Sequence, residues 1–147
     1  MNSKPFVVKP GDRSTALSVV GTSVTVLVSD ADSKDQQITL QSGDEGTGPP
    51  PHSHDWDESF YVTKGHVQFT CNGQTTMCMA GTLVHVAAGT VHAFSYGPGG
   101  GEMLEVTGRG SKAVQMFSAL DREVSPGPPD VEKVVRVAGE YGVTFHI

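Results

Sequence analysis

Short apolar runs alternate with turn-forming residues from Phe6 to about Thr107. Each run has four or five residues, and Gly, Pro, Asp or Asn separates it from the next. Runs of this length and composition predict β-strands. The strands expected on this basis are residues 24–28, 37–41, 59–63, 67–71, 83–86 and 91–94. Short strands at such spacing predict an all-β sandwich or a small barrel.

Two dipeptides within this pattern predict tight hairpin turns, Lys64-Gly65 and Asn72-Gly73. The turn at Asn72-Gly73 sets the register of its two strands, and in that register Cys71 and Cys78 do not face each other. We therefore expect no disulfide between them. Free thiols are typical of the cytosol, so the cysteines also favour a cytoplasmic protein.

The periodicity in the C-terminal part changes from that of strands to that of helices. Ser111 and Asp130 are suitable N-caps for two short helices, and a Pro-rich bend separates the two. The expected inward faces are Ala113, Val114, Phe117 and Leu120 in the first helix, and Val131, Val134, Val135 and Ala138 in the second. Gly139 or Gly142 is expected to end the second helix.

The composition is that of one globular domain, with 147 residues of which 37% are hydrophobic and 18% are charged. We expect a single domain over residues 1–147, with the barrel at about 6–107 and the helical extension at about 111–147. The net charge is -6 and the Lys and Arg residues are scattered, which argues against nucleic acid or a membrane as partner. No apolar run reaches the roughly 18 residues of a membrane span. The polar N-terminus carries no signal peptide, which also favours the cytoplasm.

Two stretches concentrate the residues that can bind a metal. His52 and His54 are separated by one residue, so on a strand both side chains point to the same face. A bend after them lets the chain return as a neighbouring strand, on which Glu58 projects to the same side. His92 offers a third imidazole from the second stretch. A lone histidine is usually structural, but imidazoles and a carboxylate that converge in this way predict a metal site.

These stretches resemble the two sequence motifs of the cupin family. The first motif, G-x5-H-x-H-x3-E-x6-G, is matched by Gly46, His52, His54, Glu58 and Gly65. The second, G-x5-P-x-G-x2-H-x3-N, is matched by Gly81, Gly89 and His92, with Ala87 in place of Pro and Tyr96 in place of Asn. Neither departure falls on a metal ligand of the family. The resemblance implies an all-β double-stranded β-helix (jelly-roll) barrel that holds one divalent metal ion per chain, and a homodimer, because cupins commonly dimerise.

A narrower resemblance bears on the chemistry. Segment 140–145 is similar to the tail of small quercetinase-like cupins, and the size and layout of the chain are similar to cupin-type cyclases of aromatic polyketide pathways. Three His and one Glu leave one or two coordination positions open, which is typical of a reactive site. The resemblance therefore implies an enzyme that chelates and activates an enolisable or phenolic small molecule, aromatic or polyketide-like.

Three functions stay open at this point. The preferred hypothesis is a zinc-dependent aromatic polyketide cyclase. With Fe, Ni or Mn the same site suits a quercetinase-like dioxygenase, and the third hypothesis is a non-catalytic ligand-binding cupin. Glu58 is interpreted as a ligand, a general base, or both in turn. His85 is either a surface residue or an extra ligand or catalytic acid–base, and the latter reading is the reason for preferring zinc.

An apolar substrate pocket is expected above the metal. The residues expected to line it are Phe60, Val62, Phe69, Phe94 and Leu104, with Trp56 at its rim. Some of these side chains can equally belong to the barrel core, and Trp56 can equally pack against Pro50 and Pro51.

Overall fold

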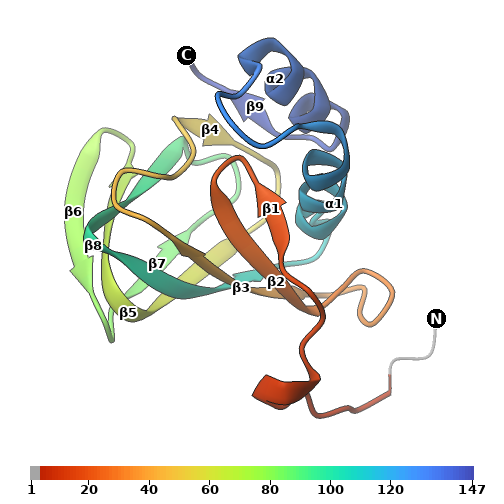
Figure 1. Cartoon of the computed structure of the whole chain (residues 1–147). Coiled ribbons are helices and arrows are strands. Elements are labelled where there is room, and N and C mark those ends of the chain that lie inside the picture. Colours follow the sequence, from red (N-terminus) through yellow and green to blue (C-terminus); the bar gives the residue numbers. More distant parts are fainter. Residues whose placement is uncertain (1–3) are drawn as a thin grey trace.

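The computed structural model describes residues 4–147, and its strands curl into one antiparallel sheet that closes as a barrel (Figure 1). The strands are β1 (Leu17–Val19), β2 (Thr22–Val28), β3 (Gln37–Gly43), β4 (His52–Ser53), β5 (Glu58–Cys71), β6 (Gln74–Met79), β7 (Leu83–Val86), β8 (His92–Thr107) and β9 (Thr144–Phe145). A 3-10 turn at Pro10–Asp12 precedes them. The all-β barrel expected from the alternation of apolar runs and turns is confirmed.

The barrel is built around β5 and β8, which pair with each other over most of their length. β8 also pairs with β3 and β4, and β5 also pairs with β6 and β7. The order of hydrogen-bonded neighbours in the sheet is β1-β2-β3-β8-β4-β9. Since β5 and β8 take part in both halves of the barrel, the residues at their ends are brought close to residues on several other strands.

The hairpin predicted at Lys64-Gly65 is wrong, because β5 runs straight through this dipeptide. Gly65 has a φ of 65° and lies opposite Gly101 of β8, with a shift of register on each side. A Cβ atom at Gly65 would lie 2.2 Å from the carbonyl oxygen of Gly100. The glycine therefore permits a close crossing of two long strands rather than a reversal of the chain.

The hairpin predicted at Asn72-Gly73 is confirmed, with φ values of 49° and 81° at its two central residues. The register that it sets pairs Cys71 with Gln74 and Val67 with Cys78. Both cysteines are free thiols, as this register predicts.

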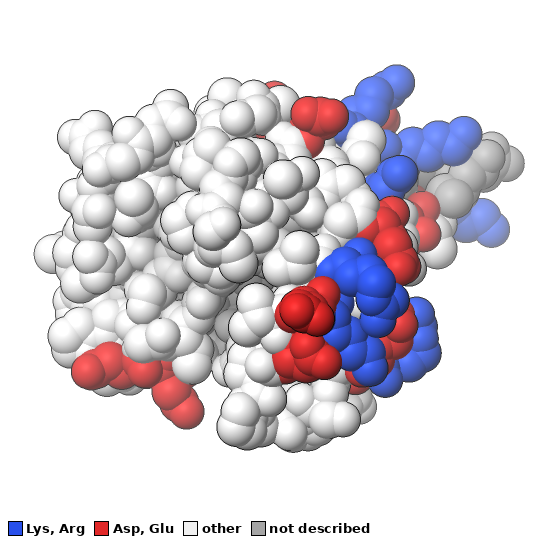
Figure 2. Space-filling model, turned by 90° about the horizontal axis from the view of Figure 1, so that it is seen from above, with Lys and Arg blue, Asp and Glu red and all other residues white. Residues whose placement is uncertain are grey.

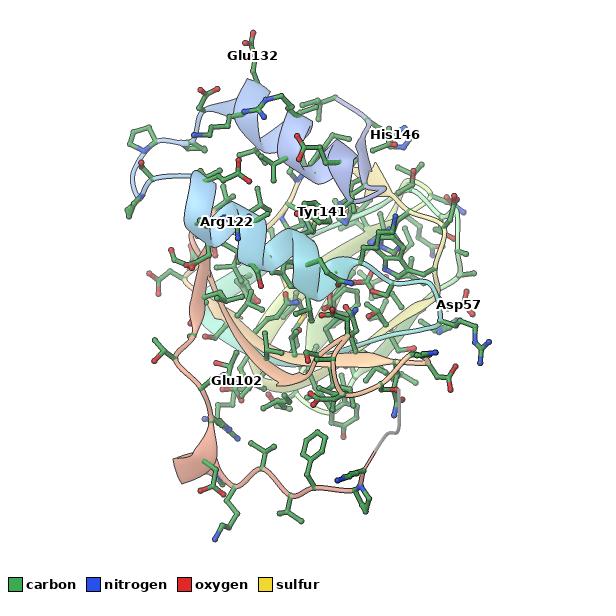
Figure 3. The ribbon with its side chains drawn as sticks, turned by 90° about the vertical axis from the view of Figure 1, so that its right-hand side faces the viewer. Asp57, Glu102, Arg122, Glu132, Tyr141 and His146 are labelled. Carbon is green, nitrogen blue, oxygen red and sulfur yellow. The ribbon has the colours of Figure 1, made fainter. Side chains whose placement is uncertain are left out.

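Two helices, α1 (Ala113–Glu123) and α2 (Val131–Glu140), cover one side of the barrel, and they face the viewer in Figure 3. Asp130 caps α2 by accepting a hydrogen bond from the backbone N–H of Lys133 at 3.2 Å. The hydroxyl of Ser111 accepts one from the N–H of Ala113 at 3.1 Å. Gly142, with a φ of 81°, follows the C-terminus of α2 in the left-handed conformation.

The inward face of α1 is the predicted one, but that of α2 is rotated by about one residue. In α1, Ala113, Val114, Phe117 and Leu120 are all buried. In α2 the buried residues are Val137 and Ala138, whereas Val131 and Val135 are 54% and 37% exposed. Val134 and Val137 lie three residues apart, so they share one face of the helix, just as the predicted residues share another. Val137 and Ala138 belong to the core between the helices and the barrel, and Val134 packs against it.

The apolar core has two parts. One fills the barrel interior with Phe60, Val62, Val67, Phe69, Cys78, Val86, Phe94, Tyr96 and Met103. The other lies between the helices and the barrel, where Val19, Val24 and Trp56 pack against both helices. Neither helix of the described residues is long and apolar enough to span a bilayer.

Charged residues do not form a basic surface on the face seen from above (Figure 2). There, Lys and Arg side chains are interleaved with Asp and Glu at one side, and a broad region carries no charge.

Candidate metal centre

Three histidines and one glutamate come together at one end of the barrel. His52 of β4 pairs directly with His92, the first residue of β8. His54 follows two residues after His52, and Glu58 is the first residue of β5. All four are buried, with between 1% and 9% of the residue exposed. The period-2 alternation predicted for His52, His54 and Glu58 is confirmed by this burial pattern.

One ring nitrogen from each of His52, His54 and His92 lies within 4.8 Å of the others. In each ring Nδ1 lies close to a backbone carbonyl oxygen: 2.9 Å from Pro50, 3.1 Å from Trp56 and 2.9 Å from Thr90, respectively. An Nδ1–H that donates to a carbonyl leaves Nε2 as the free lone pair. The backbone therefore selects the tautomer that a metal ion requires.

The carboxylate of Glu58 completes the group. Its Oε2 lies 2.9 Å from Nε2 of His54 and 3.0 Å from Nε2 of His92. Two ligand atoms that each lie about 2.1 Å from a shared metal, at a right angle, are about 3.0 Å apart. The two N–O separations therefore equal the distance expected between neighbouring ligand atoms of one metal ion. Both the donor types and their spacing fit a divalent metal ion.

Burial and mutual contacts control the protonation of these groups. Burial, assisted by the neighbouring His92, lowers the pKa of His52 to about 4, so this ring is neutral at pH 7. Burial opposes the ionisation of Glu58, but hydrogen bonds with His54 and His92 hold its pKa below the ordinary value. Burial also acts against protonation of His92, yet its hydrogen bond with Glu58 raises its pKa overall. A neutral His52 and an ionised Glu58 are the forms that bind a metal. The proton that Nε2 of His92 shares with Glu58 in the metal-free protein would have to leave before Nε2 could bind a metal.

Glu105 is a second buried carboxyl group beside Glu58, and sequence reasoning missed it. It lies on β8 with 4% of the residue exposed, and Oγ1 of Thr39 donates to it at 3.1 Å. Burial, together with the charge of Glu58 and a hydrogen bond to it, raises the pKa of Glu105 well above the ordinary value. The available signal was parity, because Glu105 shares a strand face with the buried Met103.

A cavity of about 130 Å³ opens between this group and the two helices. His52, His54, Glu58 and Glu105 lie at its polar end. The other lining residues are mainly apolar and come from β1, β2, both helices and the C-terminal segment, among them Val19, Val24, Met116, Phe117, Leu120 and Val134. The helical extension is therefore a wall of the candidate site as well as an outer layer of the barrel.

Comparison with known proteins decides the family. Residues 36–107 match the sequence profile described as a cupin domain, and this range contains all four residues of the candidate metal centre. Residues 36–107 form a cupin domain. No curated protein matches the sequence of this cupin.

Solved structures share its fold at low sequence identity. An RmlC-like cupin from Shewanella frigidimarina is 16% identical with a TM-score of 0.68, over 78% of this chain and 99% of that one. The polyketide cyclase RemF from Streptomyces resistomycificus is 21% identical with a TM-score of 0.62, over 71% and 80% of the two chains. The DMSP lyase DddQ from Ruegeria pomeroyi is 18% identical with a TM-score of 0.54, over 59% and 46%. A cyclase and a lyase share this fold, so the fold alone does not assign a reaction to this cupin.

The residues expected to line a pocket fall into two groups. Trp56 and Phe94 line the cavity of this cupin. Phe60, Val62 and Phe69 belong instead to the barrel core beneath it. Leu104 is not among the lining residues either, because it alternates with Met103 and Glu105, whose side chains point inward. The apolar walls come from β1, β2, the loops and the C-terminal segment as well as from the two helices, and none of the helical residues was expected to line the site.

His85 does not join the metal group. It is exposed on β7 and its Nδ1 lies 2.8 Å from the hydroxyl of Ser59. The register pairs Glu58 with Val86 and Ser59 with His85, so His85 lies on the face opposite to that of Glu58. Of the two interpretations left open for His85, the structure agrees with the surface residue.

Proposed function

We propose that this cupin is an enzyme that uses one divalent metal ion to activate an enolisable or phenolic small molecule. The observation that carries the proposal is the set of three buried histidines, each oriented by a backbone carbonyl, beside an open cavity. A purely structural metal site needs no cavity at its open face.

A divalent ion at this position supplies Lewis acidity toward an oxygen atom of the substrate. The histidine rings hold their orientation through their Nδ1 hydrogen bonds, and the apolar walls keep bulk water away from the reacting end. Glu58 is ionised and lies at the polar end of the cavity, where it can accept a proton from an enol, a phenol or an acidic C–H group.

The two adjacent carboxyl groups favour redox-neutral proton-transfer chemistry. Glu58 has a lowered pKa and Glu105 a raised one, so one can act as a base while the other retains a proton. A cyclisation such as that of an aromatic polyketide cyclase is a reaction of this class. Because His85 lies outside the site, it gives no reason to prefer zinc over Fe, Ni or Mn. A dioxygenase is the alternative, and the identity of the metal would decide between the two reactions.

The metal site is tested by elemental analysis of the purified protein. We expect close to one equivalent of divalent metal per chain, and the loss of most of it in His92→Ala. His85→Ala is the matched control, since the same side chain is removed from the outer face and the metal content should not change. Full metal occupancy in His92→Ala would rule out the assignment.

The reaction class is tested by turnover of enolisable and phenolic substrates with and without oxygen. A redox-neutral enzyme works equally well in both conditions, whereas a dioxygenase stops without oxygen and places oxygen atoms from O2 in its product. Glu58→Gln should reduce kcat more than it weakens binding, because it retains the shape but removes the base. Binding without turnover of any such compound would favour a non-catalytic ligand-binding cupin.

A further inference from the structure

The size of the cavity limits the ligands that the metal centre can receive. Its volume is about 130 Å³. An apolar cavity of roughly 150 Å³ holds a single benzene molecule. The space between the metal group and the helices therefore matches one ring, and a fused two-ring system exceeds it.

The wall formed by the helices is held firmly in place. Gln37 of β3 is 4% exposed, and its amide nitrogen donates to the backbone carbonyl of Ser111 at 3.1 Å. Its amide oxygen accepts from the N–H of Val114 at 2.9 Å. A buried side chain thus ties the first turn of α1 to the sheet, in addition to the apolar packing of that helix. Enlarging the cavity by moving α1 would break these hydrogen bonds.

The charge of the lining residues also restricts the ligand. Among residues 4–147, no Lys or Arg lines the cavity, whereas two carboxyl groups, Glu58 and Glu105, do. Away from the metal-facing end, a phosphate or carboxylate on the ligand would therefore find no cationic side chain to pair with. The opposite end is lined by aliphatic and aromatic groups such as Leu120 and Phe117, which favour a neutral apolar body.

Trp56 forms part of the cavity wall next to the metal group. Its ring stacks on His54 with centroids 4.3 Å apart and planes tilted by 10°. The residue is 5% exposed, so this wall is already packed in the absence of a ligand.

We infer that the ligand of this site presents two neighbouring oxygens to the metal and carries beyond them an uncharged single ring, or an apolar chain of equal size. A fused multi-ring skeleton exceeds the volume of the cavity. This inference rests on the proposed metal centre for the orientation of the ligand, and on the cavity alone for its size.

Catechol and 2,3-dihydroxynaphthalene test the size limit, because they share the same pair of hydroxyls and differ by one ring. Each is titrated by calorimetry into zinc-loaded and into metal-free protein, with the zinc content measured on the same sample. Trp56 is the single tryptophan of the chain, so its fluorescence reports binding at the cavity. We expect catechol to bind at least 10-fold more tightly than the naphthalene, although the larger ring is the more hydrophobic.

Met116→Ala on α1 and Val134→Ala on α2 should each widen the cavity. Each should reduce the ratio of catechol affinity to naphthalene affinity at least threefold. Their matched controls are Met79→Ala and Val135→Ala, where the same side chains are 64% and 37% exposed and lie outside the cavity. The controls should leave the ratio unchanged. Using two widening variants keeps the test valid if one of them fails to fold.

Equal or tighter binding of the naphthalene would overturn the inference, and so would the absence of binding by either compound to zinc-loaded protein. Neither result affects the metal content, which tests the proposed function separately. If the protein holds no divalent metal, the proposed function fails, and the ratio measured in metal-free protein still decides the size limit.

Discussion

Val20 occupies a backbone conformation that β-branched residues avoid, and its replacement by asparagine should stabilise the protein. Val20 and Gly21 form the two-residue turn between β1 and β2, with φ values of 47° and 88°. The turn at Asn72-Gly73 has nearly the same values, 49° and 81°, but carries the asparagine that such turns prefer. The chain therefore contains one turn with the preferred residue and one without it.

The left-handed conformation costs an ordinary residue about 1–2 kcal/mol, and asparagine largely avoids this cost because its side chain bonds locally. Val20 is 39% exposed, so replacing it removes only part of an apolar contact. We expect Val20→Asn to raise the free energy of unfolding by about 1 kcal/mol, which is about 2–4 °C in Tm for a chain of this size. The reverse change, Asn72→Val, should lower it by a similar amount.

Urea unfolding of metal-free protein measures both changes without a contribution from metal binding. Destabilisation by Asn72→Val without stabilisation by Val20→Asn would refute the claim that the first turn is strained. Val20 also lines the cavity, and strain at such positions is often retained for function. The stabilised variant should therefore bind catechol more weakly than the parent protein.

Three further predictions concern Gly65, His52 and Glu105. Gly65→Ala should lower the free energy of unfolding in urea by about 2–4 kcal/mol, because a Cβ would lie 2.2 Å from the carbonyl oxygen of Gly100. Gly73→Ala is the control, since Gly73 has open space around it, and should cost about 1 kcal/mol. The pKa of His52 is lowered from 6.5 to about 4 in the folded protein, so as the pH falls this ring is protonated in the unfolded chain before it is protonated in the folded protein. The metal-free protein should therefore lose about 3 kcal/mol of its free energy of unfolding as the pH falls from 6.5 to about 4. His52→Gln should lack this part of the pH dependence in urea titrations at pH 7 and pH 4, and an unchanged dependence would contradict the assignment. Because the pKa of Glu105 is raised in the folded protein, its protonated carboxyl group stabilises the folded state when the pH is below the pKa of the unfolded chain. This stabilisation is lost as the pH rises through the pKa of the folded protein. Glu105→Gln should therefore be more stable than the parent at pH 8 and similar to it at pH 4, and equal stability at both would show that Glu105 is not buried as a neutral acid.

Local patterns account for the parts of the protein that were predicted correctly. A strand places alternate residues on one face, so the shared burial of His52 and His54 follows from their spacing, and Glu58 joins them after the expected bend. The register of Cys71 and Cys78 follows from the turn between them in the same way. The homodimer, the cytoplasmic location and the identity of the metal stay predictions.

The tertiary structure decided whatever depends on residues distant in sequence. Lys64-Gly65 has the composition of a turn, but pairing of β5 with β8 on both sides of it makes a continuous strand. Glu105 carries no motif, and only the neighbourhood of Glu58 makes it part of the site. Periodicity showed that α1 and α2 have apolar faces but not what those faces enclose. The sequence by itself determined that the fold is all-β, which follows from local alternation, and the resemblance of its motifs to those of cupins brought His92 together with His52 and His54. The cavity, its size and its helical walls required the packing of segments up to about a hundred residues apart, which no local pattern encodes.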